Sequence, residues 1–280
     1  MSLQTYFEQA PLVARALGIK LTSKTFSQQR HPFAGFPLAQ LSKQVSTLVE
    51  TGHKVVIIDE SRQLDFNGKD VEITRSVTRV VSPGTGIDEL FVKTEQFNFI
   101  LSVVPASEDD DDIALGLAYR DISTGASFSR ESSLANLAGD LSLIQPSEVV
   151  LDESLRGTDV YERLLAATRR ARGNFMLSTA AMTSNSSADI TAELKAHELL
   201  ASYLATMLLN SPPPASAPTH IDVSTVMLME ASTQQALEIR SNLRGGTKGS
   251  LLSTIKRTTT MGGFRLLSER LCQWSRPPKP

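Results

Sequence analysis

The sequence is poor in cysteine and in aromatic residues. It contains one cysteine, Cys272, and one tryptophan, Trp274, and only 6% of its 280 residues are aromatic. A single cysteine excludes an intramolecular disulfide and a cysteine-based zinc site, and it fits a reducing compartment. No apolar run reaches the roughly 18 to 20 residues that cross a bilayer, and the N-terminal segment lacks the apolar core of a secretory signal. We therefore expect no membrane partner for this chain.

An excess of charge of either sign is also missing. The 28 Lys and Arg residues nearly balance the 30 Asp and Glu residues, and the formal net charge is -2. No strong overall field attracts a polyanion, but a local basic face can still bind phosphates by counterion release. The balance therefore neither proves nor excludes DNA binding. With 41% apolar residues, the chain is long enough to bury cores in two or three domains.

The motifs that carry nucleotide or metal chemistry are absent from the sequence. Its only Gly-Lys pair, Gly68-Lys69, is followed by aspartate, so the phosphate-binding loop G-x-x-x-x-G-K-[ST] does not occur. Four adjacent aspartates at 109–112 alternate in direction along an extended chain, which predicts a solvated hairpin tip rather than a metal site. The pair His197-Glu198 lacks the second histidine of a zinc-binding helix. We expect no catalytic residue, no ATP site and no metal site.

Apolar periodicity predicts a mixed α/β unit in about the first ninety residues. We expect a helix that ends near Leu17, a polar loop over residues 23–31, and a helix from Leu38 that Gly52 ends. Two strands are predicted after it, at residues 54–59 and 75–81.

The rest of the chain predicts a sheet flanked by helices and then a helical segment. Strands are expected at residues 97–104, 113–119, 126–128 and 148–151, and helices at 132–144 and 191–209. A Pro-rich connection at 211–218 precedes two more helices, at 233–242 and 250–274, and Gly262-Gly263 predicts a kink in the second.

Several short blocks, in one order along the chain, resemble the MutS family of DNA mismatch repair proteins. The blocks at residues 16–22 (ALGIKLT), 32–37 (PFAGFP) and 79–85 (RVVSPGT) are similar to landmarks of the family's mismatch-recognition domain. The connector landmarks are similar to residues 121–125 (DISTG) and 146–151 (PSEVVL), and the first lever helices to residues 230–239 (EASTQQALEI) and 260–267 (TMGGFRLL). Each block alone is weak evidence, and their shared order carries the resemblance.

The resemblance implies a chain of the α/β class with three parts. These are a mixed α/β mismatch-recognition-like domain over residues 1–93, a ribonuclease H-like connector over 94–190, and the start of an all-α lever domain over 191–280. We expect an N-terminal piece of a MutS homologue, similar to the fungal mitochondrial members, located in the mitochondrion or nucleus. ATP and Mg²⁺ serve full-length members of the family, and no cofactor is expected here because the clamp and the ATPase are absent from this chain.

The resemblance also implies a binding site for DNA. Members of the family stack a Phe on the mispaired base and place a Glu two residues later. Counting back without gaps from residues 21–22, these positions are Ser2 and Gln4, so the mismatch wedge is absent. The segments that correspond to the parts of the family that face the DNA groove and backbone hold five candidates for DNA contact. The alternative for each candidate is an ordinary solvated side chain. The candidates are Lys24, Gln28, Arg30, His31 and Arg75.

Two functions from different classes follow. The first is binding of duplex DNA with mispairs or small loops in mismatch repair, with a MutS-homologue dimer partner in the full-length protein. The alternative is a non-catalytic interaction module, in which the connector binds a repair partner without mismatch reading. For the C-terminal segment, we expect an apolar stripe that packs back on the connector, self-associates or stays exposed, made by Leu266, Leu267, Leu271 and Trp274.

Overall fold

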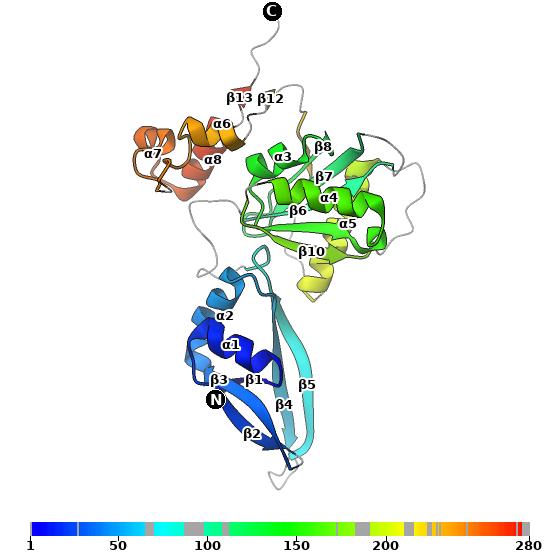
Figure 1. Cartoon of the computed structure of the whole chain (residues 1–280), viewed down its shortest axis with the longest axis vertical. Coiled ribbons are helices and arrows are strands. Elements are labelled where there is room, and N and C mark those ends of the chain that lie inside the picture. Colours follow the sequence, from blue (N-terminus) through cyan, green and yellow to red (C-terminus); the bar gives the residue numbers. More distant parts are fainter. Residues whose placement is uncertain are drawn as a thin grey trace, which may run out of the picture. The chain divides into compact units, whose positions relative to one another are not determined.

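The computed structural model contains helices, antiparallel sheets and a mixed sheet, which confirms the predicted α/β class (Figure 1). It describes residues 2–26, 28–64, 70–86, 98–107, 112–171, 173–182, 191–209, 216–222, 226–227, 229, 231–244, 246–272 and 274–275. The chain divides into two compact units, Met1–Val92 with Met207–Leu209, and Lys93–Thr206 with Asn210–Pro280.

The first unit begins with a three-stranded antiparallel sheet in the order β1-β3-β2. Its strands are β1 (Ser2–Tyr6), β2 (Thr22–Phe26) and β3 (Gln29–Pro37), and helix α1 (Gln9–Leu17) covers one face. Small side chains meet where the two pack, Ala10 and Ala14 from the helix against Ala34 from β3, so helix and sheet approach closely there.

The predicted polar loop at residues 23–31 is wrong, because this segment is the β2–β3 hairpin. Gln28 lies in its turn with a φ of 66°, a left-handed conformation that residues other than glycine adopt mainly in turns. All five residues of β2 are exposed, so no apolar alternation marks this edge strand in the sequence.

A second layer of this unit is a long hairpin of β4 (Val55–Leu64) and β5 (Asp70–Val81), which forms a sheet of its own. Helix α2 (Leu41–Glu50), which follows the short 3-10 turn η1 (Leu38–Gln40), packs on it through a small core of Val45, Val49, Ile57 and Val81. Gly52, at a φ of 86°, turns the chain out of the helix as predicted.

The second unit contains a six-stranded sheet in the order β10-β9-β6-β7-β8-β11. Strands β6, β7 and β8 form an antiparallel meander, and β9 and β10 extend it in parallel beside β6. This arrangement agrees with the ribonuclease H-like connector that the resemblance implies. The strands are β6 (Phe99–Pro105), β7 (Ala114–Asp121), β8 (Ser127–Ser133), β9 (Glu148–Asp152), β10 (Met176–Ala180) and β11 (Thr219–His220).

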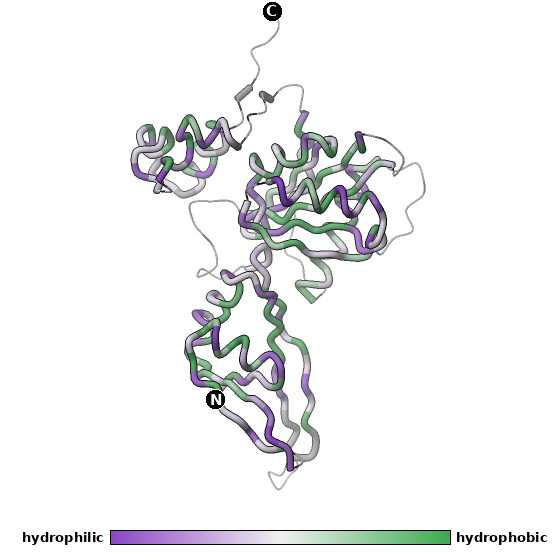
Figure 2. Tube along the Cα trace, in the orientation of Figure 1, coloured by the Kyte–Doolittle hydropathy of each residue, from purple (hydrophilic) through white to green (hydrophobic). Residues whose placement is uncertain are grey.

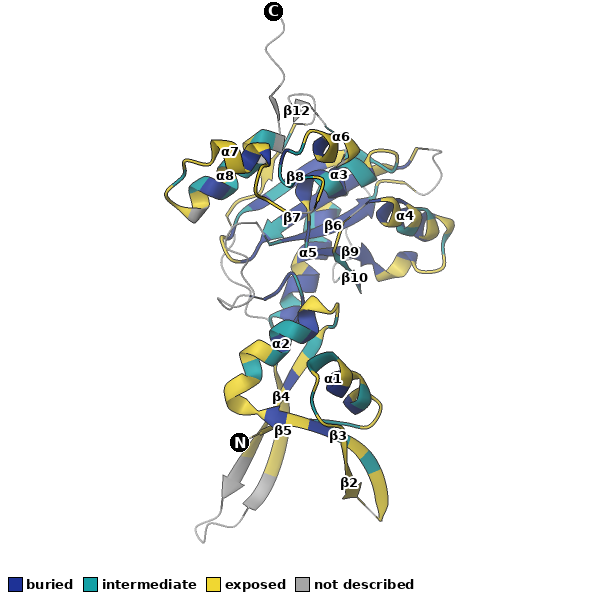
Figure 3. Cartoon of the chain, turned by 60° about the vertical axis from the view of Figure 1, so that its left-hand side comes forward, coloured by how far each residue is buried: buried dark blue, intermediate teal, exposed yellow. Residues whose placement is uncertain are grey.

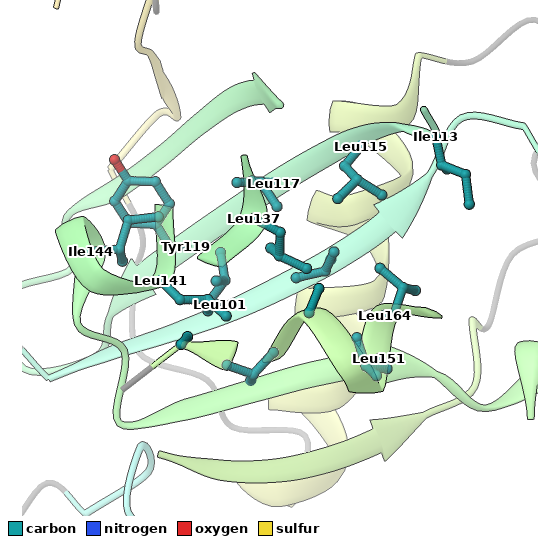
Figure 4. Packing of buried hydrophobic residues seen from close by; sticks show 14 of the residues in the cluster. Leu101, Ile113, Leu115, Leu117, Tyr119, Leu137, Leu141, Ile144, Leu151 and Leu164 are labelled. Carbon is teal, nitrogen blue, oxygen red and sulfur yellow. The ribbon is translucent and has the colours of Figure 1, made fainter. Parts of the chain in front are cut away.

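Helices cover both faces of this sheet. Helices α3 (Leu137–Ile144) and α4 (Asp159–Arg170) bury the odd-numbered side chains of β6 and β7 with their own leucines (Figure 4). Helix α5 (Ala192–Met207) lies on the opposite face, where the Ser102 hydroxyl donates to the Ala196 carbonyl at 2.7 Å. The apolar strands between them form the main core of the chain.

Two boundaries in this unit differ from the predictions. The helix expected from residue 132 begins at Leu137, because Ser132 and Ser133 continue β8 and pair with β7. Helix α4 and strand β10 were not predicted. The Thr158 side chain caps α4 by accepting from the Tyr161 N–H, and Asp159 lies in its first turn, so a helix-start signal was present in the sequence.

The C-terminal segment forms three helices, α6 (Ala231–Ala236), α7 (Leu251–Ile255) and α8 (Met261–Cys272), and a short pair of strands, β12 (Val226–Met227) and β13 (Trp274–Ser275). The kink predicted at Gly262-Gly263 is wrong, since the break lies at residues 256–260. There, the Thr260 hydroxyl accepts from the Gly263 N–H at 3.1 Å and starts a new helix.

The predicted apolar stripe of α8 is divided. Leu271 packs against the cluster of Leu143 and Ile239, which joins this segment to the connector helix α3. Leu266 is 46% exposed, and the side chain of Trp274 lies outside the described residues. Within the described ranges, no helix combines the length and apolarity needed to cross a bilayer.

Candidate nucleic-acid interface

Ser2 and Gln4, which the ungapped register predicts as the wedge positions, lie together on one face of β1. Side chains two residues apart point to the same side of a strand, and the Gln4 amide donates to the Ser2 hydroxyl at 3.1 Å. The Tyr6 hydroxyl donates in turn to the Gln4 amide oxygen. Ser2 and Gln4 are both exposed, so this edge of the sheet presents small polar groups where the family is expected to carry a ring and a carboxylate.

The structure brings two of the five DNA-contact candidates together. Lys24 on β2 is the cross-strand partner of His31 on β3, so both side chains share a face of the sheet. Arg30 pairs with Thr25 and points to the other face. Gln28 lies at the tip of the hairpin between them.

Arg75 lies apart from the other candidates, on β5 of the separate hairpin. Its guanidinium donates to the Glu60 carboxylate at 3.0 Å, and both side chains are partly exposed. The neighbouring carboxylate offsets its charge, so Arg75 is a weaker phosphate ligand than a lysine on an acid-free strand.

The first unit carries a long acid-free segment around the candidate site. Residues 9–49 contain no Asp or Glu, while Lys or Arg occurs at positions 15, 20, 24, 30 and 43. Strands β2 and β3 therefore hold no carboxylate, and β1 holds none either. The part of the β2–β3 hairpin near its turn is hydrophilic (Figure 2). This concentration of one sign is the footprint expected for phosphate contacts, although the whole chain is nearly neutral.

Three aromatic rings, one from each strand, meet on the face that carries Lys24. The Tyr6 ring centroid lies 5.5 Å from that of Phe26 and 5.3 Å from that of Phe33. The Lys24 ammonium lies 5.4 to 5.8 Å from the centroids of all three rings. The sequence pattern did not reveal this group. The sequence shows it only as aromatic residues at even spacing within strands: Phe26 is two positions after Lys24, and Phe33 is two positions after His31. We call Tyr6, Phe26 and Phe33 the ring cluster.

Two buried acidic side chains of the second unit, Asp121 and Asp140, are engaged in structural contacts. Asp121 accepts from the backbone and hydroxyl of Ser123, at 2.8 and 2.6 Å, and so closes the turn after β7. Arg130 pairs with Asp140 at 2.5 Å inside the connector. Burial raises the pKa of the Asp140 carboxyl, and the Arg130 guanidinium acts against this shift.

Among the described residues, no three His, Cys, Asp or Glu side chains converge as a metal site. Asp109, Asp110 and Asp111 lie outside the described residues, and Asp112 is exposed and accepts from the Ala135 N–H at 3.4 Å.

Comparisons with known proteins match both units. A family model described as MutS domain I matches residues 3–90, and one described as MutS domain II matches residues 98–213. The DNA mismatch repair protein MutS of Rhodopseudomonas palustris (strain BisB18) is 29% identical over 284 residues, which cover 96% of this chain and 31% of that protein. The protein of the same name from Rickettsia canadensis (strain McKiel) is 27% identical over 285 residues, covering 94% and 32%.

The chain spans about a third of the length of the curated relatives that it matches. The two matched ranges follow each other in the order of the family and account for most of the sequence, and the resemblance to the bacterial MutS proteins extends beyond them to almost the whole chain. This chain therefore belongs to the MutS family of DNA mismatch repair proteins and carries its domains I and II.

Proposed function

We propose that this chain binds duplex DNA with mispairs or small loops, as the DNA-contacting part of a mismatch repair protein. The observation that carries the proposal is the match to MutS domain I over residues 3–90, the unit whose three-stranded sheet β1-β3-β2 carries basic residues and no carboxylate. Lys24 and Arg30, on opposite faces of the hairpin, would contact phosphates, and such contacts position a protein without reading sequence.

The proposal includes weak discrimination between mispaired and matched DNA. A wedge that enters a kinked minor groove works because unstacking is easier at a mispair. In the ungapped register, the wedge positions hold Ser2 and Gln4, which offer neither a ring nor a carboxylate. Affinity should therefore depend mainly on phosphate contacts and fall steeply with salt.

The experiment is an anisotropy titration of labelled duplexes, matched or with a central G·T pair, over a series of salt concentrations. We expect binding at low salt with little difference between the two duplexes. Lys24→Ala and Arg30→Ala should each weaken binding to both duplexes and reduce the salt slope by about one. Lys43→Ala, which removes an exposed cation on α2 instead, is the charge-matched control.

Absence of binding at low salt by the folded chain would contradict the proposal. It would favour the alternative, an interaction module whose connector binds a repair partner. A normal affinity of the Lys24 and Arg30 variants would place the phosphate contacts on other residues.

We also propose that the chain lacks an ATP site, and we propose a partner and a cellular location for it. The chain binds no ATP and no Mg²⁺, because it contains no Gly-rich loop that aims amides and a lysine at phosphates. Micromolar binding of a fluorescent nucleotide in the presence of magnesium would contradict this. The protein pairs with a second MutS homologue, which co-purification would test. It is similar to the fungal mitochondrial members, and cell fractionation would test its location in the mitochondrion.

A further inference from the structure

The ring cluster forms an apolar surface that is partly exposed, since Phe26 is exposed while Tyr6 and Phe33 are half-buried. Phe26 is 38% exposed, and the adjoining Phe7 is 56% exposed. Helix α1 covers the opposite face of the sheet, where Ala34 and Phe36 are buried (Figure 3). Aromatic rings kept in water on a rigid sheet cost hydration free energy, which is a common mark of a binding surface.

Backbone geometry holds the cluster in place. Tyr6 and Phe33 are direct cross-strand partners, so the strand register sets their separation. The ring of Phe33 lies next to Gly35, two residues further along β3. A Cβ at Gly35 would lie 3.3 Å from the Phe33 ring and 2.9 Å from the Leu3 carbonyl oxygen. The missing side chain of Gly35 therefore leaves the room that the Phe33 ring occupies.

The chemistry around the rings selects the kind of occupant. Lys24 stands among them, His31 lies 6.1 Å from the Phe26 ring, and the three strands carry no carboxylate. An occupant that fits both features has a flat π-face and a negative charge beside it. A nucleotide combines these in one unit, because its base stacks on aromatic rings while its phosphate meets the lysine.

The base must already be unpaired to reach these rings. A base inside a duplex presents only its edges to the grooves, and its faces are covered by its stacked neighbours. The wedge that would unstack a paired base is replaced here by Ser2. We propose that the ring cluster, together with Lys24, is a stacking platform for an unpaired nucleotide of single-stranded DNA. This inference rests on the proposed function, since it places a specific contact within the same DNA-binding unit.

The test uses the full chain and a labelled oligothymidylate, a matched duplex, and the same duplex with one extrahelical thymidine. We expect the single strand to bind more tightly than the matched duplex, with the looped duplex between them. Phe26→Ala and Tyr6→Ala should each weaken single-strand binding at least about fivefold, because stacking on one ring contributes on the order of this factor or more. Their salt slopes should stay unchanged, since neither carries charge, whereas Lys24→Ala should reduce the slope.

Matched controls separate stacking from folding. Leu12→Ala removes an apolar side chain on α1 that is 46% exposed and should leave binding unchanged. Phe26→Trp, made in a Trp274→Phe background because the chain holds a single tryptophan, should keep the affinity. Its indole emission should be quenched by the oligothymidylate, which a ring with only a structural role would not show.

The outcomes distinguish this inference from the proposed function. Salt-dependent DNA binding that the ring variants leave unchanged would overturn the stacking platform while the proposed function stands. No binding to any of the DNAs would overturn both. Loss of single-strand affinity with an unchanged salt slope, in variants that melt like the parent chain, would support the platform.

Discussion

The hydroxyl of Tyr203, on α5, donates a hydrogen bond to the carboxyl group of Glu148, on β9, and both side chains are buried. The Ser178 hydroxyl on β10 donates to the same Glu148 oxygen at 2.5 Å. These contacts join α5, which begins after the predicted end of the connector at residue 190, to strands β9 and β10 of the connector sheet. Helix α5 is thus a packed part of the second unit.

Tyr203→Phe should destabilise the second unit by about 1 to 3 kcal/mol, because it removes a donor from a buried carboxyl group while keeping the ring. Chemical denaturation followed by far-ultraviolet circular dichroism measures this. Ser178→Ala, on the other donor, should cost a similar amount, and the double variant should cost less than the sum if both serve one network. Equal stability of the parent chain and Tyr203→Phe would show that the contact contributes nothing.

The ion pair of Arg130 and Asp140 gives a second prediction. Both side chains are almost fully buried, so Arg130→Met should cost about 3 to 5 kcal/mol by leaving a buried carboxyl group without its cation. Replacing both partners, Arg130→Met with Asp140→Leu, should recover most of that loss. A double variant that is less stable than Arg130→Met alone would contradict this account, and urea titrations of the single and double variants decide it.

Close packing at Gly116 gives a third prediction. A Cβ at Gly116 on β7 would overlap the backbone of Ala192 and Glu193 at the start of α5. Gly116→Ala should therefore destabilise the second unit by at least about 1 to 3 kcal/mol, since backbone atoms must move. Gly139→Ala on α3 is the control: it has open space and should stabilise its helix by up to about 1 kcal/mol. Thermal melts of the two variants should shift in opposite directions.

The fourth prediction concerns pH. Burial lowers the pKa of His197 on α5 below its usual value near 6.5, and Glu193 opposes this shift. Its Nε2 has no hydrogen-bond partner among the described residues. Because of this lowered pKa, the unfolded chain binds the proton more readily than the folded chain does. The neutral, buried imidazole therefore contributes its full share to the free energy of unfolding above about pH 6.5, and this share is lost as the pH falls through the folded pKa.

Denaturation midpoints measured between pH 7 and pH 5 test that sign. The parent chain should lose stability as the pH falls, and His197→Gln, which cannot titrate, should show a shallower dependence. His53→Gln, in the first unit, is the matched control for replacing a histidine by glutamine. A steeper fall in His197→Gln would mean that the imidazole is charged in the folded state.

Local chemistry in the sequence was sufficient for much of the fold. The central residues of strands β6, β7 and β9 are mostly apolar because both faces of the sheet are covered. The periodicity of α2 and the stop at Gly52 depend only on neighbouring residues. Order and spacing of the family blocks were enough to place the chain in the MutS family. The missing wedge at Ser2 and Gln4 was also read from spacing alone, and its register stays a prediction.

Tertiary structure alone decided the features that depend on distant residues. The ring cluster forms because strand register brings Tyr6 against Phe33 and places Phe26 beside them, although long stretches of sequence separate Tyr6 from the other two. Exposed strand β2 has no apolar pattern to reveal it, since neither of its faces is buried in the core. Likewise, the partner of α5 is set by the absent side chain of Gly116 and the buried Glu148, which lie far from it in the sequence. A sequence pattern records which side chains prefer burial, and the fold decides which of them meet.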